Sequence, residues 1–347
     1  MPSITTLIPT FRRPDRLRRA ILSACRQSAH EVIVHVFDNA SGDNTPDIVR
    51  ELQQTYPLIR YTSRAKNIGA LENFAAAVAA VETPYFSILS DDDYLLPEFY
   101  RHAVDALDMT PEAMFWIGAT LNVGPDDRVW DARLLRWPRD GLYSPPQGAA
   151  QFLGGNAAAW TGMVFRREVL DAAPFIDVSL GGPCDLDYTL RLACMYPFLV
   201  RRIPVAVLHL SADSFSTTSP LSSFWPGWKR IIERFQNHPD LDAQTRHALS
   251  SQLHRDARSM LVRRAIHGIA FGRDDFVEET VHALRQDEGL VVVPGLLRLA
   301  LTTFQWIPAS RHLTRAVYRT IERRLVASRQ SVLGQYNKLL SVGLPNP

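Results

Sequence analysis

Cysteine is scarce in this sequence. Its 347 residues include three, Cys25, Cys184 and Cys194, and no two of them have the Cys-x-x-Cys spacing. An odd and sparse count argues against a disulfide framework and favours a reducing compartment. The opening residues also lack the positive and then apolar regions of a signal peptide. We therefore expect a cytoplasmic protein without structural disulfides.

Long hydrophobic runs are absent as well. A membrane-spanning helix needs about 20 predominantly apolar residues. The nearest stretch, residues 289–308, is interrupted by Pro294, Arg298 and Gln305. It fits a helix in a membrane interface, or a buried helix, better than a membrane span.

Two classes of binding motif are missing too. The sequence has no GxxxxGKS or GxxxxGKT loop, which excludes a P-loop phosphotransferase. It also has no known RNA-reading or DNA-reading motif, so we expect no nucleic-acid partner.

What the sequence does contain is a regular alternation of strand and helix patterns. Apolar runs typical of strands cover residues 4–10, 31–39, 59–63 and 85–89. Segments with helical spacing lie between them, at residues 13–27, 44–56 and 70–81. This alternation predicts an α/β fold with a Rossmann-like, mixed but mostly parallel sheet and helices on both faces.

The rest of the chain divides at a polar segment, residues 211–220. Before it, residues 198–210 have the pattern of a final pair of strands, and beyond residue 224 the pattern is helical. We expect a catalytic domain over residues 1–215 and a helical region over residues 216–347.

Polar segments follow four of the expected strands: PTFRR (9–13), DNASGDNT (38–45), SRAKNIG (63–69) and SDDD (90–93). In a parallel sheet the carboxyl ends of the strands share one edge, where ligands bind. The last segment places three carboxylates side by side, which costs free energy unless water or a cation surrounds them. The sequence therefore predicts a ligand site at this edge.

These segments resemble the inverting glycosyltransferases of family 2, which have the GT-A fold. The resemblance covers residues 3–210 and is carried by IPTFRR, FDNASGDNT, AKNIGALEN, LSDDDYLLP and DLDYTLRLA followed by IPVAVLH. It implies a nucleotide-sugar donor, Mn²⁺ or Mg²⁺ as cofactor, and a hydroxyl acceptor on a glycan or a lipid-linked glycan. UDP is the default nucleotide, with dTDP and GDP open. Bacterial-type surface polysaccharide or glycoconjugate synthesis is the implied setting.

The resemblance also assigns donor-binding residues: Pro9, Thr10, Phe11, Arg12, Asp38, Lys66, Asn67, Asp91 and Asp92. It implies that Asp38 accepts a hydrogen bond from the base, that Asp92 accepts one from the ribose, and that Asp91 lies nearer the donor sugar. Turn formation is the alternative for Asp38, because Asp, Asn, Ser and Gly all favour turns. A buried loop aromatic is the alternative for Phe11, and a surface lysine for Lys66.

For the metal, the resemblance implies Asp93 as a ligand, with His209 completing the site. Neutral imidazole suits Mn²⁺ better than Mg²⁺. The alternatives are a solvated turn for the aspartates and an ordinary hydrogen-bonded histidine.

For the chemistry, an inverting transfer needs a base that removes the proton of the acceptor hydroxyl. The resemblance implies Asp185 as this base, with Asp187 as the competitor, although Cys184 stands where many members have glutamate. Helix capping is the alternative, since aspartates favour the first turn of a helix.

A sugar-1-phosphate nucleotidyltransferase and a catalytically inactive nucleotide-sugar-binding module are the alternative functions. The absence of glycine from PTFRRPDR (9–16) speaks against the former.

The end of the chain is basic. After residue 290 there are eight basic residues and one acidic residue, Glu322. Between the arginines, apolar residues recur at helical spacing: Leu313, Val317, Ile321, Leu325 and Val332. This amphipathic pattern predicts contact with the inner face of an anionic membrane, with oligomerisation or a solvated helix face as alternatives.

Overall fold

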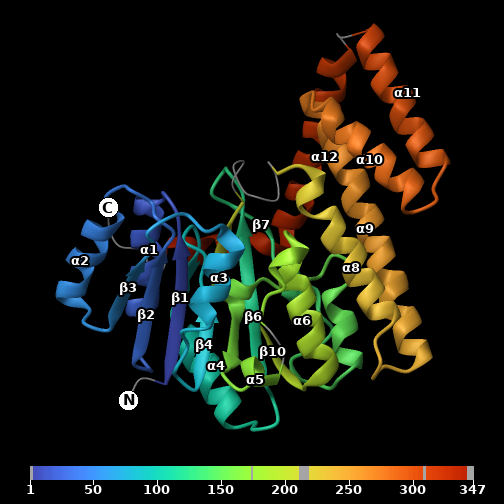
Figure 1. Cartoon of the computed structure of the whole chain (residues 1–347). Helices are drawn as coiled ribbons and strands as arrows, with labels where there is room; N and C mark the ends of the chain where they lie inside the picture. Colours follow the sequence, from blue (N-terminus) through green and yellow to red (C-terminus); the bar gives the residue numbers. More distant parts are fainter. Residues whose placement is uncertain (1–2, 173–174, 211–218, 308–309, 342–347) are drawn as a thin grey trace.

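The computed structural model describes residues 3–172, 175–210, 219–307 and 310–341. A mixed sheet with helices on both faces forms the first part, and a group of helices lies beside it (Figure 1). This confirms the predicted fold class. The expected domain boundary at 215–216 lies outside the described residues. None of the described helices is long and apolar enough to cross a membrane.

The first half of the sheet is parallel, as predicted. It consists of β1 (Ile4–Thr10), β2 (Val32–Asp38), β3 (Ile59–Ser63) and β4 (Tyr85–Ile88). Their spatial order is β3-β2-β1-β4, and the register pairs Thr10 with Asp38. The polar segments that follow these strands therefore start at one edge of the sheet.

The second half of the sheet is mixed. Its strands are β5 (Tyr94–Leu95), β6 (Phe115–Val123), β7 (Val129–Asp131), β8 (Gly141–Tyr143), β9 (Met163–Arg166) and β10 (Phe198–His209). The short strand β9 lies antiparallel between β4 and β6, whereas β10 runs parallel to β6. The prediction of a strand pair at 198–210 was wrong: β10 is one strand with register shifts on both sides of Pro204. Proline cannot donate to the ladder, so it interrupts the pairing without ending the strand.

Helices cover both faces of the sheet. They are α1 (Pro14–Cys25), α2 (Thr45–Thr55), α3 (Ala70–Val78), α4 (Phe99–Asp108), the short α5 (Val169–Ala172) and α6 (Cys184–Met195). Buried residues of α1, α2 and α4 pack together on one face, whereas those of α3 and α6 pack on the other. In α1, for example, Leu17 and Ile21 are fully buried. Burying each such side chain contributes roughly 1.5–3 kcal/mol.

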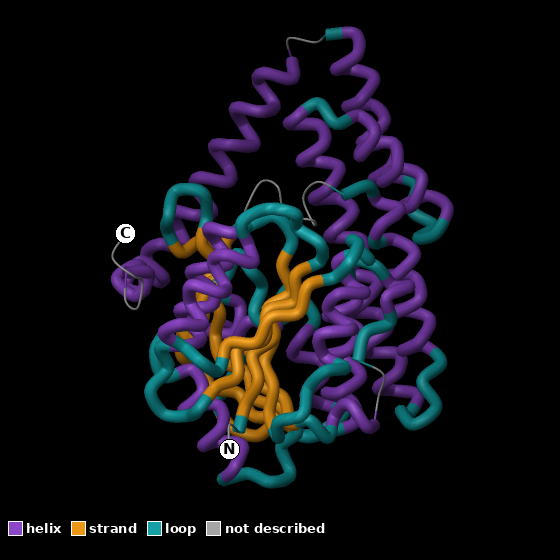
Figure 2. The backbone as a smooth tube through the Cα atoms, turned by 60° about the vertical axis from the view of Figure 1, so that its left-hand side comes forward, coloured by secondary structure: helices purple, strands orange, loops and turns teal. Residues whose placement is uncertain are grey.

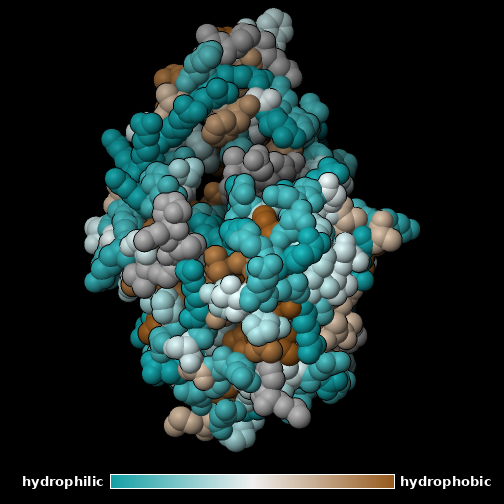
Figure 3. All heavy atoms as spheres, turned by 90° about the vertical axis from the view of Figure 1, so that its left-hand side faces the viewer, coloured by the Kyte–Doolittle hydropathy of each residue, from teal (hydrophilic) through white to brown (hydrophobic). Residues whose placement is uncertain are grey.

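Short 3₁₀ helices occupy the connections: η1 (Arg133–Arg136), η2 (Gln147–Phe152), η3 (Trp160–Gly162), η4 (Val178–Leu180) and η5 (Leu221–Ser223). The exposed face beside α2 and the β3 edge is mostly hydrophilic, with scattered apolar residues (Figure 3). A polar surface of this kind protects an edge strand from pairing with another chain.

The C-terminal region is helical, as predicted. It comprises α8 (Trp225–Gln236), α9 (Ala243–Phe271), α10 (Asp274–Gln286), α11 (Val292–Trp306), α12 (Ser310–Leu333) and η6 (Gly334–Ser341). The long helix α9 begins after Asp242, whose carboxylate accepts from Thr245 N, and ends at Gly272, which has φ 76°. Helices α8, α9 and α10 share one apolar core with α6, so the helical region packs on the same sheet face as α6 (Figures 1 and 2).

The end of the chain returns to the sheet. Tyr94 OH donates to the carbonyl oxygen of Leu340 at 3.1 Å, and Val129 N donates to Asn337 Oδ1 at 3.0 Å. Leu333 packs in a small apolar cluster with residues of β6, β7 and β10. The segment that follows α12 is therefore held on the β5–β7 side of the first domain.

Candidate active site

The loop after β1 is joined to the three aspartates that follow β4. Thr10 Oγ1 donates to Asp91 Oδ2 at 2.8 Å, and the guanidinium of Arg13 bridges Asp91 Oδ1 at 3.1 Å and Asp92 Oδ2 at 2.8 Å. Burial nevertheless raises the pKa of Asp91 above its ordinary value. These carboxylates need nearby positive charge, which Arg13 provides here.

The third aspartate, Asp93, has different neighbours. Its carboxylate is 2% exposed and accepts from Thr161 Oγ1 at 2.7 Å and from the backbone N of His209 at 3.1 Å. Burial without a paired cation raises its pKa to about 8. Burial also lowers the pKa of His209 to about 4, so its imidazole is neutral at pH 7. The structure thus joins His209 to Asp93 through its backbone N, while the Nδ1 atom of its imidazole lies 3.3 Å from Arg19 Nη2.

Asp38 lies beneath the loop that follows β2. Its carboxylate is 2% exposed and accepts from Ser41 N at 2.9 Å, from Ser41 Oγ, and from Tyr61 OH at 2.7 Å. Arg12, at φ 56°, also holds this loop, because its N donates to Ser41 Oγ at 2.9 Å. In this structure Asp38 stabilises the turn, which was the alternative to a contact with the base.

Asn39 connects the loops after β2 and β3, a role that sequence reasoning missed. Its Nδ2 donates to Asn67 Oδ1 and to the carbonyl oxygen of Gly69, both at 3.0 Å, and its Oδ1 accepts from Ile68 N at 2.9 Å. In the sequence, the available signal was the position of Asn39 at the end of an apolar strand pattern, within the polar segment 38–45. Lys66, in the same loop as Asn67, is exposed.

These loops surround a cavity of about 660 Å³, which we call the donor cavity. Its walls are Pro9, Thr10, Phe11, Arg13, Asn39, Asn67, Ala70, Asn73, Phe74, Ser90, Asp91, Asp92 and Asp185. Six of the predicted donor-binding residues therefore line one space, and so does the predicted base. Arg12, Asp38, Lys66, Asp93 and His209 do not form part of its wall.

The two candidate bases have different surroundings. Asp187 is 0% exposed and accepts from Arg191 Nε at 2.9 Å and from Arg234 Nη1. Asp185 is in contact with solvent, yet surrounding protein atoms raise its pKa above the ordinary value. Asp185 is therefore the more accessible of the two carboxylates.

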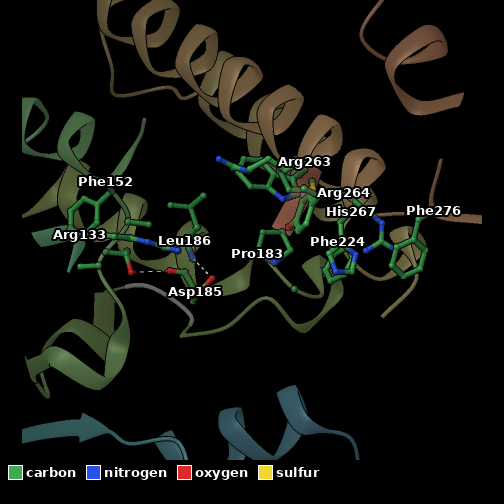
Figure 4. Close-up of a pocket in the computed structure, with 17 residues that line it drawn as sticks. Arg133, Phe152, Pro183, Asp185, Leu186, Phe224, Arg263, Arg264, His267 and Phe276 are labelled. Atoms are coloured by element: carbon green, nitrogen blue, oxygen red, sulfur yellow. Dashed lines mark hydrogen bonds between the residues drawn. The ribbon is translucent and has the colours of Figure 1, made fainter. Parts of the chain in front are cut away.

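A second cavity, of about 560 Å³, lies between α6 and the C-terminal helices, and we call it the interdomain cavity. It is lined by residues of η1, η2 and α6 and by residues of α8, α9, α10 and α12. Figure 4 shows Asp185 and Arg133 on one side of it and Arg263, Arg264 and His267 on the side of α9. Asp185 lines both cavities, so the two spaces meet at this residue.

The sequence of this α/β region matches a known family. Residues 5–172 match the family model described as Glycosyl transferase family 2. Residues 5–172 form a family 2 glycosyltransferase domain. The matched segment contains the loops after β1, β2, β3 and β4 that line the donor cavity, whereas Asp185 lies beyond it.

Characterised relatives of this glycosyltransferase match over short segments. The succinoglycan biosynthesis protein ExoO of Rhizobium meliloti is 28% identical over 108 residues, which are 31% of this chain and 30% of that protein. A β-1,3-glucosyltransferase of Campylobacter jejuni, named for a GalNAc(5)-diNAcBac-PP-undecaprenol substrate, is 30% identical over 97 residues, 28% of this chain and 31% of that protein. The matched segments thus span less than a third of these relatives.

Solved structures share the fold. Staphylococcus aureus TarS in complex with UDP-GlcNAc superposes with a TM-score of 0.63 at 15% identity, covering 92% of each chain. The Pyrobaculum calidifontis mannosyltransferase PcManGT, in complex with GDP-Man and Mn²⁺, has a TM-score of 0.52 at 15% identity, with 95% of this chain and 87% of that chain covered. At this coverage, the similarity to TarS includes C-terminal helices as well as the GT-A fold.

The residues around Asp93 fit a divalent cation. Within the parts of the chain that the structure describes, no three His, Cys, Asp or Glu side chains form a group that could hold a metal by themselves. Mg²⁺ and related hard cations need fewer protein ligands, because waters and substrate phosphates supply the rest. Asp93 has a buried carboxylate that forms no ion pair with any described residue, so it is a suitable donor. The neutral imidazole of His209 is the second donor present, although its Nδ1 already lies 3.3 Å from Arg19 Nη2.

Proposed function

We propose that this glycosyltransferase is a metal-dependent, inverting enzyme that transfers a sugar from a nucleoside diphosphate donor, by default a UDP-sugar, to a hydroxyl acceptor. The observation that carries the proposal is the position of Asp185, which lines both the donor cavity and the interdomain cavity. A base in this position reaches an acceptor hydroxyl on one side while the anomeric carbon of the donor lies on the other.

The nucleotide-sugar occupies the donor cavity in this proposal. Thr10, Phe11 and Asn67 hold the nucleoside, and Asp91 and Asp92 accept hydrogen bonds from ribose and sugar hydroxyls. Arg12, Asp38 and Lys66 remain predictions as donor contacts, because they lie outside the wall of the cavity. Support for a UDP-sugar comes from the fold shared with TarS, whose structure contains UDP-GlcNAc.

The metal belongs beside Asp93 and His209. When bound, Mn²⁺ or Mg²⁺ neutralises charge that develops on the diphosphate as it leaves. Asp93 and His209 would supply the protein ligands. The Mn²⁺ in the PcManGT structure supports a cation in this fold.

Asp185 is the proposed base. The acceptor oxygen forms a bond to the anomeric carbon, its proton passes to the Asp185 carboxylate, and the bond from that carbon to the diphosphate breaks with its electrons on the leaving oxygen. Because attack comes from the face opposite the leaving group, configuration inverts. The raised pKa of Asp185 makes it a stronger base than an ordinary aspartate. Asp187 would act as a positioning residue, because its ion pairs with Arg191 and Arg234 hold the start of α6.

The acceptor is proposed to belong to surface polysaccharide synthesis, because ExoO is named for succinoglycan and the Campylobacter jejuni enzyme for a lipid-linked substrate. A lipid-linked acceptor would place the enzyme at a membrane surface. Exposed apolar residues of α11 and α12, among them Leu296, Trp306, Leu313 and Ile321, support peripheral contact of this kind.

A thermal-shift panel tests the proposal. The full chain is heated with UDP, dTDP, GDP and ADP, each with and without Mn²⁺. We expect one nucleoside diphosphate, UDP first, to raise the melting temperature with Mn²⁺ and to have little effect without it. Equal shifts for all four nucleotides, or no shift with any, would contradict the proposed donor class.

A further inference from the structure

The interdomain cavity has an unbalanced charge. Three arginines, Arg133, Arg263 and Arg264, line it together with one carboxylate, Asp185. Three positive charges against one negative charge leave an excess of two. Such a space attracts anions and disfavours a neutral or cationic occupant.

The arginines differ in how far protein acids compensate them. Arg133 Nε lies 3.7 Å from Asp131, and Arg264 Nη2 lies 3.6 Å from Glu279. Arg264 Nη2 also donates to the carbonyl oxygen of Ser219 at 2.9 Å, and its guanidinium lies over the Phe276 ring. Arg263 is exposed and, within the described residues, forms no hydrogen bond or ion pair. Its charge is therefore available to a molecule in the cavity.

Arg264 supplies a second, independent observation. Its side chain is only 8% exposed, and its Nε is buried with no hydrogen-bond partner among the described residues. Leaving a buried donor of a charged group unpaired costs its full desolvation free energy. A bound oxygen atom in this cavity would satisfy it.

The rest of the wall suits a sugar. Phe224, Trp228 and Tyr318 present aromatic groups beside the arginines, and Met260 adds further apolar surface. Aromatic rings offer flat apolar faces against which rings of a ligand can pack. Guanidinium groups bind carboxylates and phosphates through paired hydrogen bonds.

From these observations we infer that the interdomain cavity is the acceptor site and that it takes an anionic acceptor, a saccharide carrying a carboxylate or a phosphate, held by Arg263 and Arg264 with its reactive hydroxyl toward Asp185. This inference rests on the proposed function, because it takes the donor to occupy the neighbouring cavity. It adds the charge class of the acceptor. Either source of the anion, a uronic acid or a phosphate group, satisfies the same arginines.

Calorimetric titration of the full chain tests this inference. The protein is first saturated with UDP and Mn²⁺, so that the donor cavity is filled, and is then titrated with trigalacturonic acid, glucose 1-phosphate and neutral maltotriose. We expect at least one anionic probe to bind, with an affinity that falls as salt is raised, and maltotriose to bind at least about ten-fold more weakly. Tighter binding of trigalacturonic acid would indicate a carboxylate in the acceptor, and tighter binding of glucose 1-phosphate would indicate a phosphate.

Arg263→Glu is the decisive variant, because the Arg263 side chain is exposed and forms no hydrogen bond or ion pair with the part of the chain that the structure describes. The substitution should lower the affinity for the anionic probe at least about ten-fold, while the melting temperature of the protein changes little. Arg298→Glu is the matched control: it makes the same charge change at an exposed position of α11 that lines neither cavity. We expect it to change the affinity less than two-fold.

The outcomes separate the two proposals. If UDP with Mn²⁺ fails to bind, the proposed function fails, and the titration without UDP still measures the anion site. If neither anionic probe binds, if maltotriose binds as well as they do, or if Arg263→Glu and Arg298→Glu have equal effects, the anionic acceptor site is overturned.

Discussion

Asp185 and Asp187 lie two residues apart at the start of α6, and their carboxylates have opposite surroundings. Asp187 is completely buried between Arg191 and Arg234, whereas Asp185 lies where the donor and interdomain cavities meet. One aspartate is thus held by two ion pairs within the protein, and the other lines two open cavities. The two residues should respond differently to the same substitution.

Replacing Asp185 with asparagine should remove the base and keep the fold. We expect transfer to fall by a factor of roughly 10²–10⁴, the usual contribution of a positioned base. UDP binding should stay within about two-fold of the wild type. Assay of sugar transfer, together with a UDP thermal shift, measures both. Normal turnover by Asp185→Asn would show that the base is another group.

In the wild type, the same carboxylate should set the acidic limb of the pH–rate profile. Only its ionised form accepts a proton, and its pKa is raised. The rate should therefore fall on acidification at a higher pH than the ordinary aspartate range. A profile that stays flat down to pH 4 would contradict this assignment.

Asp187→Asn should lower the free energy of unfolding. It leaves two arginines facing a neutral amide in a buried site, and breaking a buried ion pair costs about 3–5 kcal/mol. Urea unfolding of this variant and of Asp185→Asn gives a matched comparison at neighbouring positions. A smaller loss of stability for Asp187→Asn than for Asp185→Asn would disprove the anchoring role.

Asp93→Asn should show opposite effects on stability and on metal binding. The folded-state pKa of Asp93 is about 8, above its value of about 3.8 when unfolded, so the folded metal-free protein holds this proton more tightly. Its contribution to stability is complete at low pH and is lost as pH rises toward and through 8. Asparagine does not titrate, so the variant does not lose stability in this way as pH rises.

We therefore expect metal-free Asp93→Asn to gain stability relative to the wild type between pH 6 and pH 8. Urea unfolding in EDTA at both pH values measures the difference. The Mn²⁺-dependent UDP shift should disappear in the same variant. A difference in stability that is constant with pH would contradict the raised pKa, and a retained Mn²⁺ effect would remove Asp93 from the metal site.

The membrane proposal depends on exposed apolar residues of α11 and α12. Trp306, 83% exposed, lies at the end of α11, which in Figure 1 is far from the sheet. Trp306→Glu should lower recovery of the protein with anionic liposomes in a flotation assay, because a charge there opposes insertion into the interface. Met109→Glu is the control, since Met109 is 85% exposed at the end of α4. Equal recovery of both variants would count against contact through α11.

Local patterns were sufficient to predict much of the fold. The parallel half of the sheet was predicted from the apolar runs of β1, β2, β3 and β4 and from the helical spacing of apolar residues between them. The prediction succeeded because the apolar residues of these segments are the ones that the fold buries. The antiparallel insertion of β9 between β4 and β6 could not be read from sequence, since strand order depends on pairing between distant segments. The strand pair predicted at residues 198–210 is the single strand β10, because its pairing with β6 resumes beyond Pro204.

The sequence predicted those parts of the site that are formed by short motifs directly after strands. Thr10, Asp91, Asp92 and Asn67 follow strands of one sheet, so their convergence followed from topology. The burial of Asp187 could not be predicted in this way, because its partner Arg234 is 47 residues away on α8. The interdomain cavity could not be predicted from the sequence either. Its arginines come from η1 and α9, and only the tertiary arrangement, with α9 across the cavity from α6, brings them together.

The most direct test of the account is a crystal structure of the full chain grown with UDP and Mn²⁺, with data collected at the manganese absorption edge. The account predicts an anomalous peak beside the Asp93 carboxylate and the His209 imidazole, with UDP density in the donor cavity between Thr10 and Asp92. A nucleotide bound elsewhere, or manganese bound away from Asp93, would contradict it.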